Sequence, residues 1–137
     1  MTIPEGFSPH FRKSKFTDPW EPLFSKVEDK QVRLGVELRE AHCNSRGLVH
    51  GVFLAALADN SMGLSCALMQ GASGRAAGGT VTVNLTIDYL GKAGVGEWVE
   101  SDIDVVKAGR SLCFANCIIA TGAGPVSRAS AIFKVLT

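Results

Sequence analysis

The sequence predicts an α+β protein in which one long central helix is wrapped by a curved antiparallel β-sheet. Residues 44–70 contain the one long apolar stretch of helical length, and five other segments have the composition of strands. The connectors between the last four strands are short and contain glycine, as antiparallel connections require. One helix accompanied by so many strands has to lie against a single sheet.

Length and composition fit one globular domain with a substantial core. The chain has 137 residues, of which 46% are apolar and 20% charged, and a chain of this length buries about two thirds of its unfolded surface. A net charge of +1 argues against nucleic-acid binding. The N-terminus lacks the apolar run of a secretory signal, and residues 59–61 interrupt the longest apolar stretch with polar side chains. Neither a signal peptide nor a membrane-spanning helix is therefore expected.

The chain has four cysteines, at Cys43, Cys66, Cys113 and Cys117. Their spacing shows no CxxC motif and no closely spaced pairs of the kind found in disulfide frameworks. We interpret them as reduced, mostly buried residues of a cytoplasmic protein. His42 lies near Cys43, but two histidines and a distant aspartate are a weak metal constellation, so no metal site is expected. No phosphate-binding glycine motif precedes a helix, and no cofactor is expected.

Residues 1–30 are expected to form an irregular, partly helical lead-in that packs on the main domain, residues 31–137. This lead-in contains four of the five prolines, which forbid one long helix, and much of the aromatic content, which argues against disorder. Its aromatic side chains can serve either plain packing or the wall of a pocket. The main domain begins with a strand at 31–39, whose apolar side chains point one way: Val32, Leu34, Val36 and Leu38.

Four more strands are expected after the helix, at 80–90, 97–106, 110–120 and 126–136, in a meander of successive neighbours. Alternation in the first of them places the apolar residues from Val81 to Tyr89 on one face. The polar residues from Thr82 to Asp88 fall on the other face.

The helix carries a carboxylate, Asp59, in the middle of an apolar surface that has no polar stripe. A buried, unpaired carboxylate is costly, so Asp59 is expected to be paired, exposed or functional. Gly51 stands at the helix start, where its backbone N–H is one of the unpaired donors of the first turn. Such donors, with the helix dipole, attract a developing oxyanion.

Gly51 and Asp59 cannot meet within one helix, because eight residues separate them by about 12 Å along the axis. Two antiparallel helices in a symmetric dimer would bring Asp59 of one subunit to the helix start of the other. This spacing predicts two identical sites, each with a carboxylate facing an oxyanion donor. The alternative is that Asp59 caps a backbone group or faces solvent.

The pattern Asn44-x5-His50-Gly51-x7-Asp59, followed by the strand TVTVNLTIDYL, resembles the PaaI-type acyl-CoA thioesterases of the hotdog superfamily. The resemblance covers about residues 31–136 and agrees with the hotdog order of elements. It implies a metal-independent hydrolase for acyl-CoA, at least a homodimer, with a homotetramer as a further option.

The resemblance also implies roles for individual residues. The Gly51 N–H would polarise the thioester carbonyl, Asn44 and His50 would shape the same pocket, and Asp59 of the other subunit would act as base or nucleophile. Thr82 would orient the attacking water. Residues near the CoA moiety would be Tyr89 and, in the turn at 107–111, Lys107, Gly109, Arg110 and Ser111.

One position departs from the family pattern, because Val52 stands where relatives usually have a second glycine. A side chain at this position is expected to affect which acyl groups fit the pocket, whereas the Gly51 N–H and therefore the type of reaction are retained. Two alternatives stay open: a hotdog hydratase or dehydratase that uses His50 with Asp59, and a protein that binds acyl-CoA without cleaving it. The sequence does not identify the acyl group.

Overall fold

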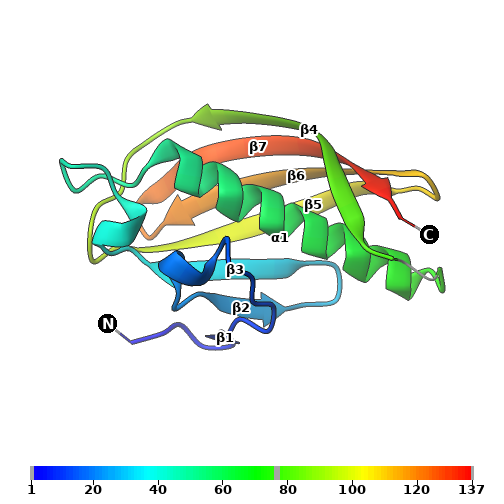
Figure 1. The fold of residues 1–137 in the computed structure, drawn as a ribbon, viewed down its shortest axis with the longest axis horizontal. Coiled ribbons are helices and arrows are strands. Elements are labelled where there is room, and N and C mark those ends of the chain that lie inside the picture. Colours follow the sequence, from blue (N-terminus) through cyan, green and yellow to red (C-terminus); the bar gives the residue numbers. More distant parts are fainter. Residues whose placement is uncertain (1, 76–77, 137) are drawn as a thin grey trace.

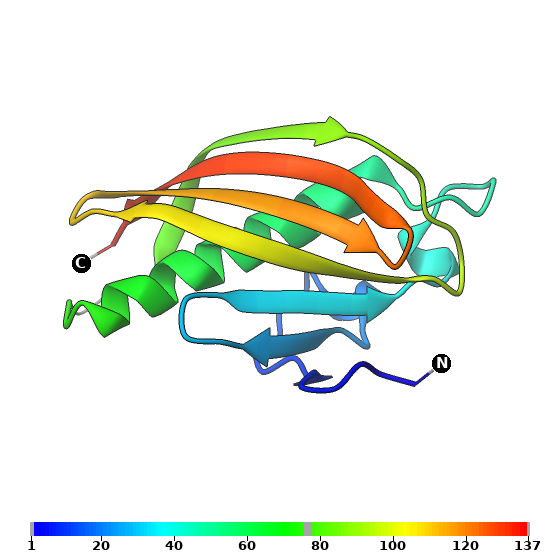
Figure 2. The ribbon, with the colours of Figure 1, turned by 180° about the vertical axis from the view of Figure 1, so that it is seen from behind.

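The computed structural model describes residues 2–75 and 78–136. Its elements in chain order are β1 (Ser8–Pro9), the 3-10 turn η1 (Asp18–Trp20), β2 (Phe24–Val27), β3 (Val32–Glu37), the 3-10 turn η2 (Glu40–His42), α1 (Gly51–Ala72), β4 (Thr80–Tyr89), β5 (Trp98–Ala108), β6 (Leu112–Thr121) and β7 (Gly124–Val135). The predicted helix and all five predicted strands are present. Figures 1 and 2 show α1 lying along the concave face of one curved sheet, which confirms the expected α+β hotdog fold.

The described strands form one antiparallel sheet in the order β1-β2-β3-β5-β6-β7-β4. The expectation that the last four strands form a simple meander was wrong, because β4 pairs with β7 at the sheet edge and β5 pairs with β3. The segment between β4 and β5 passes the start of α1, where the Val49 N–H donates to the Ala93 carbonyl at 2.8 Å. Glycine-rich composition predicted a turn there but carried no information about which strands it joins.

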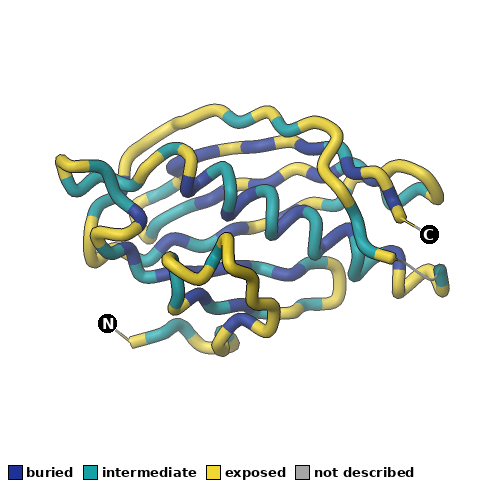
Figure 3. The backbone as a smooth tube through the Cα atoms, in the orientation of Figure 1, coloured by how far each residue is buried: buried dark blue, intermediate teal, exposed yellow. Residues whose placement is uncertain are grey.

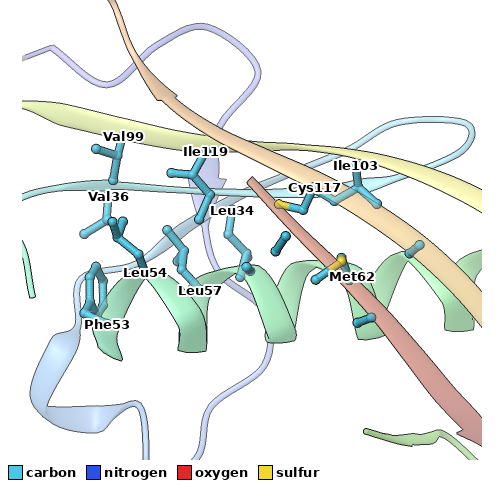
Figure 4. Close-up of a cluster of buried hydrophobic side chains, with 14 of the residues drawn as sticks. Leu34, Val36, Phe53, Leu54, Leu57, Met62, Val99, Ile103, Cys117 and Ile119 are labelled. Carbon is cyan, nitrogen blue, oxygen red and sulfur yellow. The ribbon is translucent and has the colours of Figure 1, made fainter. Parts of the chain in front are cut away.

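The core lies between α1 and the sheet. Phe53, Leu54, Leu57 and Met62 project from the helix toward apolar side chains of β3, β5 and β6 (Figure 4). The four apolar residues predicted to share one face of the first main-domain strand are all buried, at Val32, Leu34, Val36 and Leu38. By length and mean hydropathy, 1.5 over 18 residues, α1 could also cross a membrane. A core helix has the same composition. Buried residues recur along the whole of α1 (Figure 3), and its buried apolar side chains belong to the core cluster shared with the sheet.

Buried serines complete the hydrogen bonding where β3 and β5 diverge. These two strands pair only from Gly35 to Glu37, which leaves the backbone of Val32 without a β5 partner. Ser65 Oγ accepts from the Val32 N–H at 2.9 Å, and Ser61 Oγ donates to the Val32 carbonyl at 2.9 Å. Buried backbone groups need such partners, so the two helix serines have structural roles.

The lead-in extends the sheet through β1 and β2 and lies beside the first half of α1 (Figure 1), where the Trp20 and Phe53 ring centroids are 5.2 Å apart. The sequence did not predict β2, which pairs with β3 from Phe24 to Val27. His42 fixes the segment before β2: its Nδ1 accepts from the Arg39 N–H at 3.0 Å, and its Nε2–H donates to the Trp20 carbonyl at 2.8 Å. The imidazole also stacks on Phe53, with ring centroids 4.5 Å apart, so one buried side chain joins lead-in and helix.

Candidate functional site

The loop before α1 is built around Asn44. Its side-chain oxygen accepts from the Arg46 N–H at 2.9 Å and from the Leu48 N–H at 3.2 Å, which closes a tight turn. A short asparagine side chain is well suited to this turn. In this structure Asn44 therefore shapes the loop that leads to the helix.

His50 caps the helix. Its Nδ1 accepts from the Val52 N–H at 3.2 Å, so the neutral ring carries its proton on Nε2. The His50 carbonyl accepts the first helical hydrogen bonds, from Phe53 and Leu54. This arrangement agrees with a role for His50 in holding the helix entry.

The backbone N–H of Gly51 forms no hydrogen bond with any described residue. The Tyr89 hydroxyl, from the far end of β4, donates to the Gly51 carbonyl at 2.8 Å. A Cβ on residue 51 would lie 3.0 Å from Cζ of the Tyr89 ring, so the close approach of that ring favours glycine. Tyr89, at the end of the edge strand β4, thus fixes the position of Gly51, whose backbone N–H has no hydrogen-bond partner among the described residues.

Asp59 lies half-buried in the middle of α1, and Thr82 on β4 lies beside it. The Thr82 hydroxyl donates to Asp59 Oδ1 at 2.5 Å. Strict alternation had placed Thr82 on the face opposite Leu85 and Ile87. A β-bulge between Thr82 and Asn84 shifts the register by one residue, so Thr82 pairs with the buried Phe133 and faces the helix.

A cavity of about 510 Å³ opens at Asp59 and Thr82. Phe53, Leu57 and Gly63 of α1 supply part of its wall, and the lead-in supplies another part. The lead-in residues that line it include His10, Arg12, Lys13 and Trp20. Its volume lies in the range of small-molecule sites, about 300–1,000 Å³. Sequence reasoning raised a pocket role for the lead-in aromatics but missed His10, Arg12 and Lys13, because nothing local relates them to α1.

The turn between β5 and β6 lies at the opposite end of α1 from Gly51 (Figure 1). Gln70, in the last turn of the helix, donates to the Gly109 carbonyl at 2.6 Å, and Arg75 donates to the Ala108 carbonyl at 2.5 Å. Lys107, Arg110 and Ser111 are exposed on this turn. The structure therefore separates the predicted CoA-binding residues, since Tyr89 lies at the helix start and the turn lies at the helix end.

Burial changes the acid–base behaviour of two histidines. The pKa values of His10 and His42 are lowered, primarily because burial disfavours the imidazolium ion. Burial also raises the pKa of the Cys117 thiol to about 12, which leaves it a poor nucleophile. Within residues 2–75 and 78–136, no three side chains of histidine, cysteine, aspartate or glutamate gather as a metal site would require.

The free edge of β4 carries exposed apolar side chains. They are Val81, Val83 and Tyr89, and they continue into Leu90 and into Val52 at the helix start. A long edge strand with exposed apolar residues is a surface that proteins usually cover.

A family model described as the thioesterase superfamily matches residues 46–127, which include Gly51, Asp59 and Thr82. The Pseudomonas aeruginosa protein "Putative esterase PA0474" is 39% identical over 137 residues, 98% of each chain. Human acyl-coenzyme A thioesterase 13 is 34% identical over 83 residues, which span 59% of this chain and 54% of that protein.

Two solved structures illustrate the fold likeness. A thioesterase protein from Streptococcus pneumoniae, described as hypothetical and solved with coenzyme A, has a TM-score of 0.74 at 23% identity and covers 85% of this chain and 90% of its own. The phenylacetic acid degradation protein PaaI from Thermus thermophilus, in a variant form, has a TM-score of 0.75 at 21% identity and covers 90% of this chain and 100% of its own.

Proposed function

Because this chain belongs to the thioesterase superfamily, we propose that it hydrolyses an acyl-CoA thioester to a free acid and CoA. The observation that carries the proposal is the Asp59–Thr82 pair, which lies at a cavity of substrate size. The unpaired Gly51 N–H supplies the second element that thioester hydrolysis needs, a donor for the carbonyl oxygen.

The proposed site forms between two subunits. Antiparallel packing of two α1 helices brings Asp59 of one subunit to the helix start of the other, a separation that one helix cannot close. The exposed apolar edge of β4, which runs beside α1, supports this arrangement as the surface that a second copy covers. Pairing of two β4 edges would also satisfy their free backbone groups.

In the proposed reaction the thioester carbonyl oxygen accepts a hydrogen bond from the Gly51 N–H, and the helix dipole favours the charge that develops there. Asp59 either removes a proton from water, which then attacks the carbonyl carbon, or attacks that carbon directly to give an anhydride that water cleaves. In both routes the carbon–sulfur bond breaks, and CoA leaves as a thiolate that takes up a proton. Thr82 holds the Asp59 carboxylate in position.

The same dimer geometry supports CoA contacts from the turn between β5 and β6. If Asp59 faces Gly51 of the partner subunit, Gln70 falls eleven residues, or about 16 Å, beyond that glycine along the helix axis. The turn at residues 107–111 is hydrogen-bonded to Gln70. We place the CoA phosphates there, with the pantetheine arm covering the distance from the thioester. Lys107, Arg110 and Ser111 are the proposed contacts, because cations and hydroxyls suit phosphate.

The decisive experiment measures free-thiol release from short, medium, long and aryl acyl-CoA thioesters by the wild type and by Asp59→Ala. Asp104→Asn is the matched control, because it removes an exposed carboxylate on β5. We expect release by the wild type and the control, and loss in Asp59→Ala with the fold retained. Full activity in Asp59→Ala would overturn the mechanism.

Two further measurements on the wild type and Asp59→Ala, product analysis with an enoyl-CoA and acyl-CoA affinity, separate two alternatives. Conversion of an enoyl-CoA to a hydrated thioester without thiol release would indicate a hotdog hydratase that uses His50 with Asp59. Binding of acyl-CoA with no conversion, and with affinity unchanged by loss of Asp59, would indicate a non-catalytic binding protein. The Asp59–Thr82 hydrogen bond favours hydrolysis, because a binding protein has no need for an oriented carboxylate.

A further inference from the structure

The cavity at Asp59 has two chemically different walls. The part formed by α1, β3 and β7 is largely apolar, with Leu34, Phe53, Leu57 and Phe133. The part formed by the lead-in is polar and basic, with His10, Arg12 and Lys13. An acyl group that fills this space meets hydrocarbon along one side and hydrogen-bond donors along the other.

The basic residues of the lead-in differ in their partners. Lys13 Nζ pairs with Glu21 Oε2 at 3.1 Å. Arg12 forms no ion pair with any carboxylate of the described residues, although it lines the cavity. A guanidinium without an acidic partner is the group that binds a carboxylate most specifically, through two parallel hydrogen bonds.

His10 adds a second polar group to the same wall. Only 6% of its surface is exposed, and its Nδ1 has no hydrogen-bond partner within the described residues. Its backbone N–H donates to the Leu23 carbonyl at 2.9 Å, which fixes this part of the lead-in against the start of β2. A buried polar atom without a partner is rare in folded proteins and points to a ligand or water as the missing partner.

We propose that this wall selects acyl groups that have an apolar body and end in a carboxylate, that is, CoA monothioesters of dicarboxylic acids. Arg12 binds the terminal carboxylate, and His10 lies beside it as a second polar contact. The inference rests on the proposed thioesterase function and names its substrate class. It concerns selectivity only, because Arg12 and His10 lie on a different wall segment from the reacting pair.

The test compares two thioesters of equal chain length, adipoyl-CoA and hexanoyl-CoA, which differ only in the terminal carboxylate. We measure kcat/KM for both with the wild type, Arg12→Gln and Lys15→Gln. Lys15 is the matched control, because it is an exposed cation of the same segment that does not line the cavity. Thermal unfolding of each variant establishes that the fold is retained.

We expect the wild type to prefer adipoyl-CoA and Arg12→Gln to lower the ratio of the two kcat/KM values by about tenfold or more, the usual effect of losing a charge-assisted hydrogen bond. Lys15→Gln should leave the ratio unchanged. An equal fall for both substrates in Arg12→Gln would overturn the proposal and assign Arg12 to a phosphate of CoA. A wild type that prefers hexanoyl-CoA would also overturn it. If the wild type released thiol from none of the acyl-CoA thioesters, the proposed function itself would be overturned.

Discussion

The Thr82 hydroxyl donates a 2.5 Å hydrogen bond to the Asp59 carboxylate across a separation of 23 residues in the chain. One residue comes from the centre of the helix and the other from the edge strand, so the contact joins the two elements that would meet a second subunit. A charge-assisted hydrogen bond of this length fixes the direction of the carboxylate.

Replacement of Thr82 by valine should lower kcat about 10- to 100-fold with little change in KM. The variant keeps the shape of the side chain but removes the donor that orients Asp59, and misplacement of a reacting group has an effect of this size. Thr82→Ser should restore most of the activity, because it restores the hydroxyl. An equal loss in the serine variant would contradict the role given to the hydrogen bond.

Tyr89→Phe should destabilise the protein by about 0.5–1.5 kcal/mol, because it removes the hydrogen bond to the Gly51 carbonyl while the ring stays in place. Gly51→Ala should cost more, since the new Cβ would press on the Tyr89 ring at 3.0 Å. In a Tyr89→Ala background that extra cost should disappear. Urea unfolding of the two single variants and the double variant measures the coupling, and additive effects would exclude the contact as its cause.

Wild-type stability should fall as the pH drops below about 6.5, the ordinary His value. The folded-state pKa values of His10 and His42 are lowered, so near and below this pH the unfolded chain binds more protons than the folded one. The contribution of neutral His42 is therefore present above the unfolded pKa and lost as the pH falls. His42→Gln should reduce the slope of unfolding free energy against pH by at most about 1.4 kcal/mol per pH unit. An unchanged slope in urea titrations between pH 5 and 7 would contradict this assignment.

Ser61→Ala should lower stability by about 1–3 kcal/mol, because it removes the hydroxyl that bonds the buried Val32 carbonyl and the buried Ser101 hydroxyl. Ser130→Ala, an exposed position on β7, should change stability by less than about 0.5 kcal/mol. Chemical denaturation of both variants makes the comparison. Equal losses would show that the Ser61 hydroxyl has no special role.

Val83→Asp should disrupt the proposed homodimer, because it places a charge on the exposed edge of β4, where residue 83 is 57% exposed. Val27→Asp is the matched control, since Val27 on β2 is equally exposed at 58% but far from that edge. Light scattering after size-exclusion chromatography gives the mass of each variant. A Val83→Asp protein of unchanged dimeric mass would assign the interface to another surface.

Sequence patterns predicted the elements that depend on local periodicity. The alternation at 31–39 corresponds to four buried side chains, and the apolar stretch after Gly51 corresponds to α1. Strand neighbours were less predictable, because the pairing of β4 with β7 depends on contacts between segments about 50 residues apart. A glycine-rich connector is equally compatible with a hairpin and with a crossover.

For the candidate site, too, local features were predictable from the sequence and long-range contacts were not. Spacing placed Gly51 and Asp59 on one helix, too far apart to meet within one subunit, and the structure retains that separation. The Asp59–Thr82 contact was not predicted. Family resemblance implied only that Thr82 orients the attacking water, and strict alternation turns Thr82 away from the helix because the bulge has no sequence signal. The contribution of the lead-in to the cavity wall was not predicted. Its polar residues lie at the cavity because β2 pairs with β3, a pairing that the sequence did not reveal.

The cavity wall has a consequence for how such enzymes diversify. The segment matched by the family model, residues 46–127, holds the proposed reacting groups, whereas His10 and Arg12 lie outside it. Under the two proposals, reaction and selectivity are encoded in separate stretches of the gene, and the cavity-lining residues of the N-terminal stretch can change without altering the reacting groups. Grafting the lead-in of one homologue onto the body of another would then transfer acyl preference as a portable module.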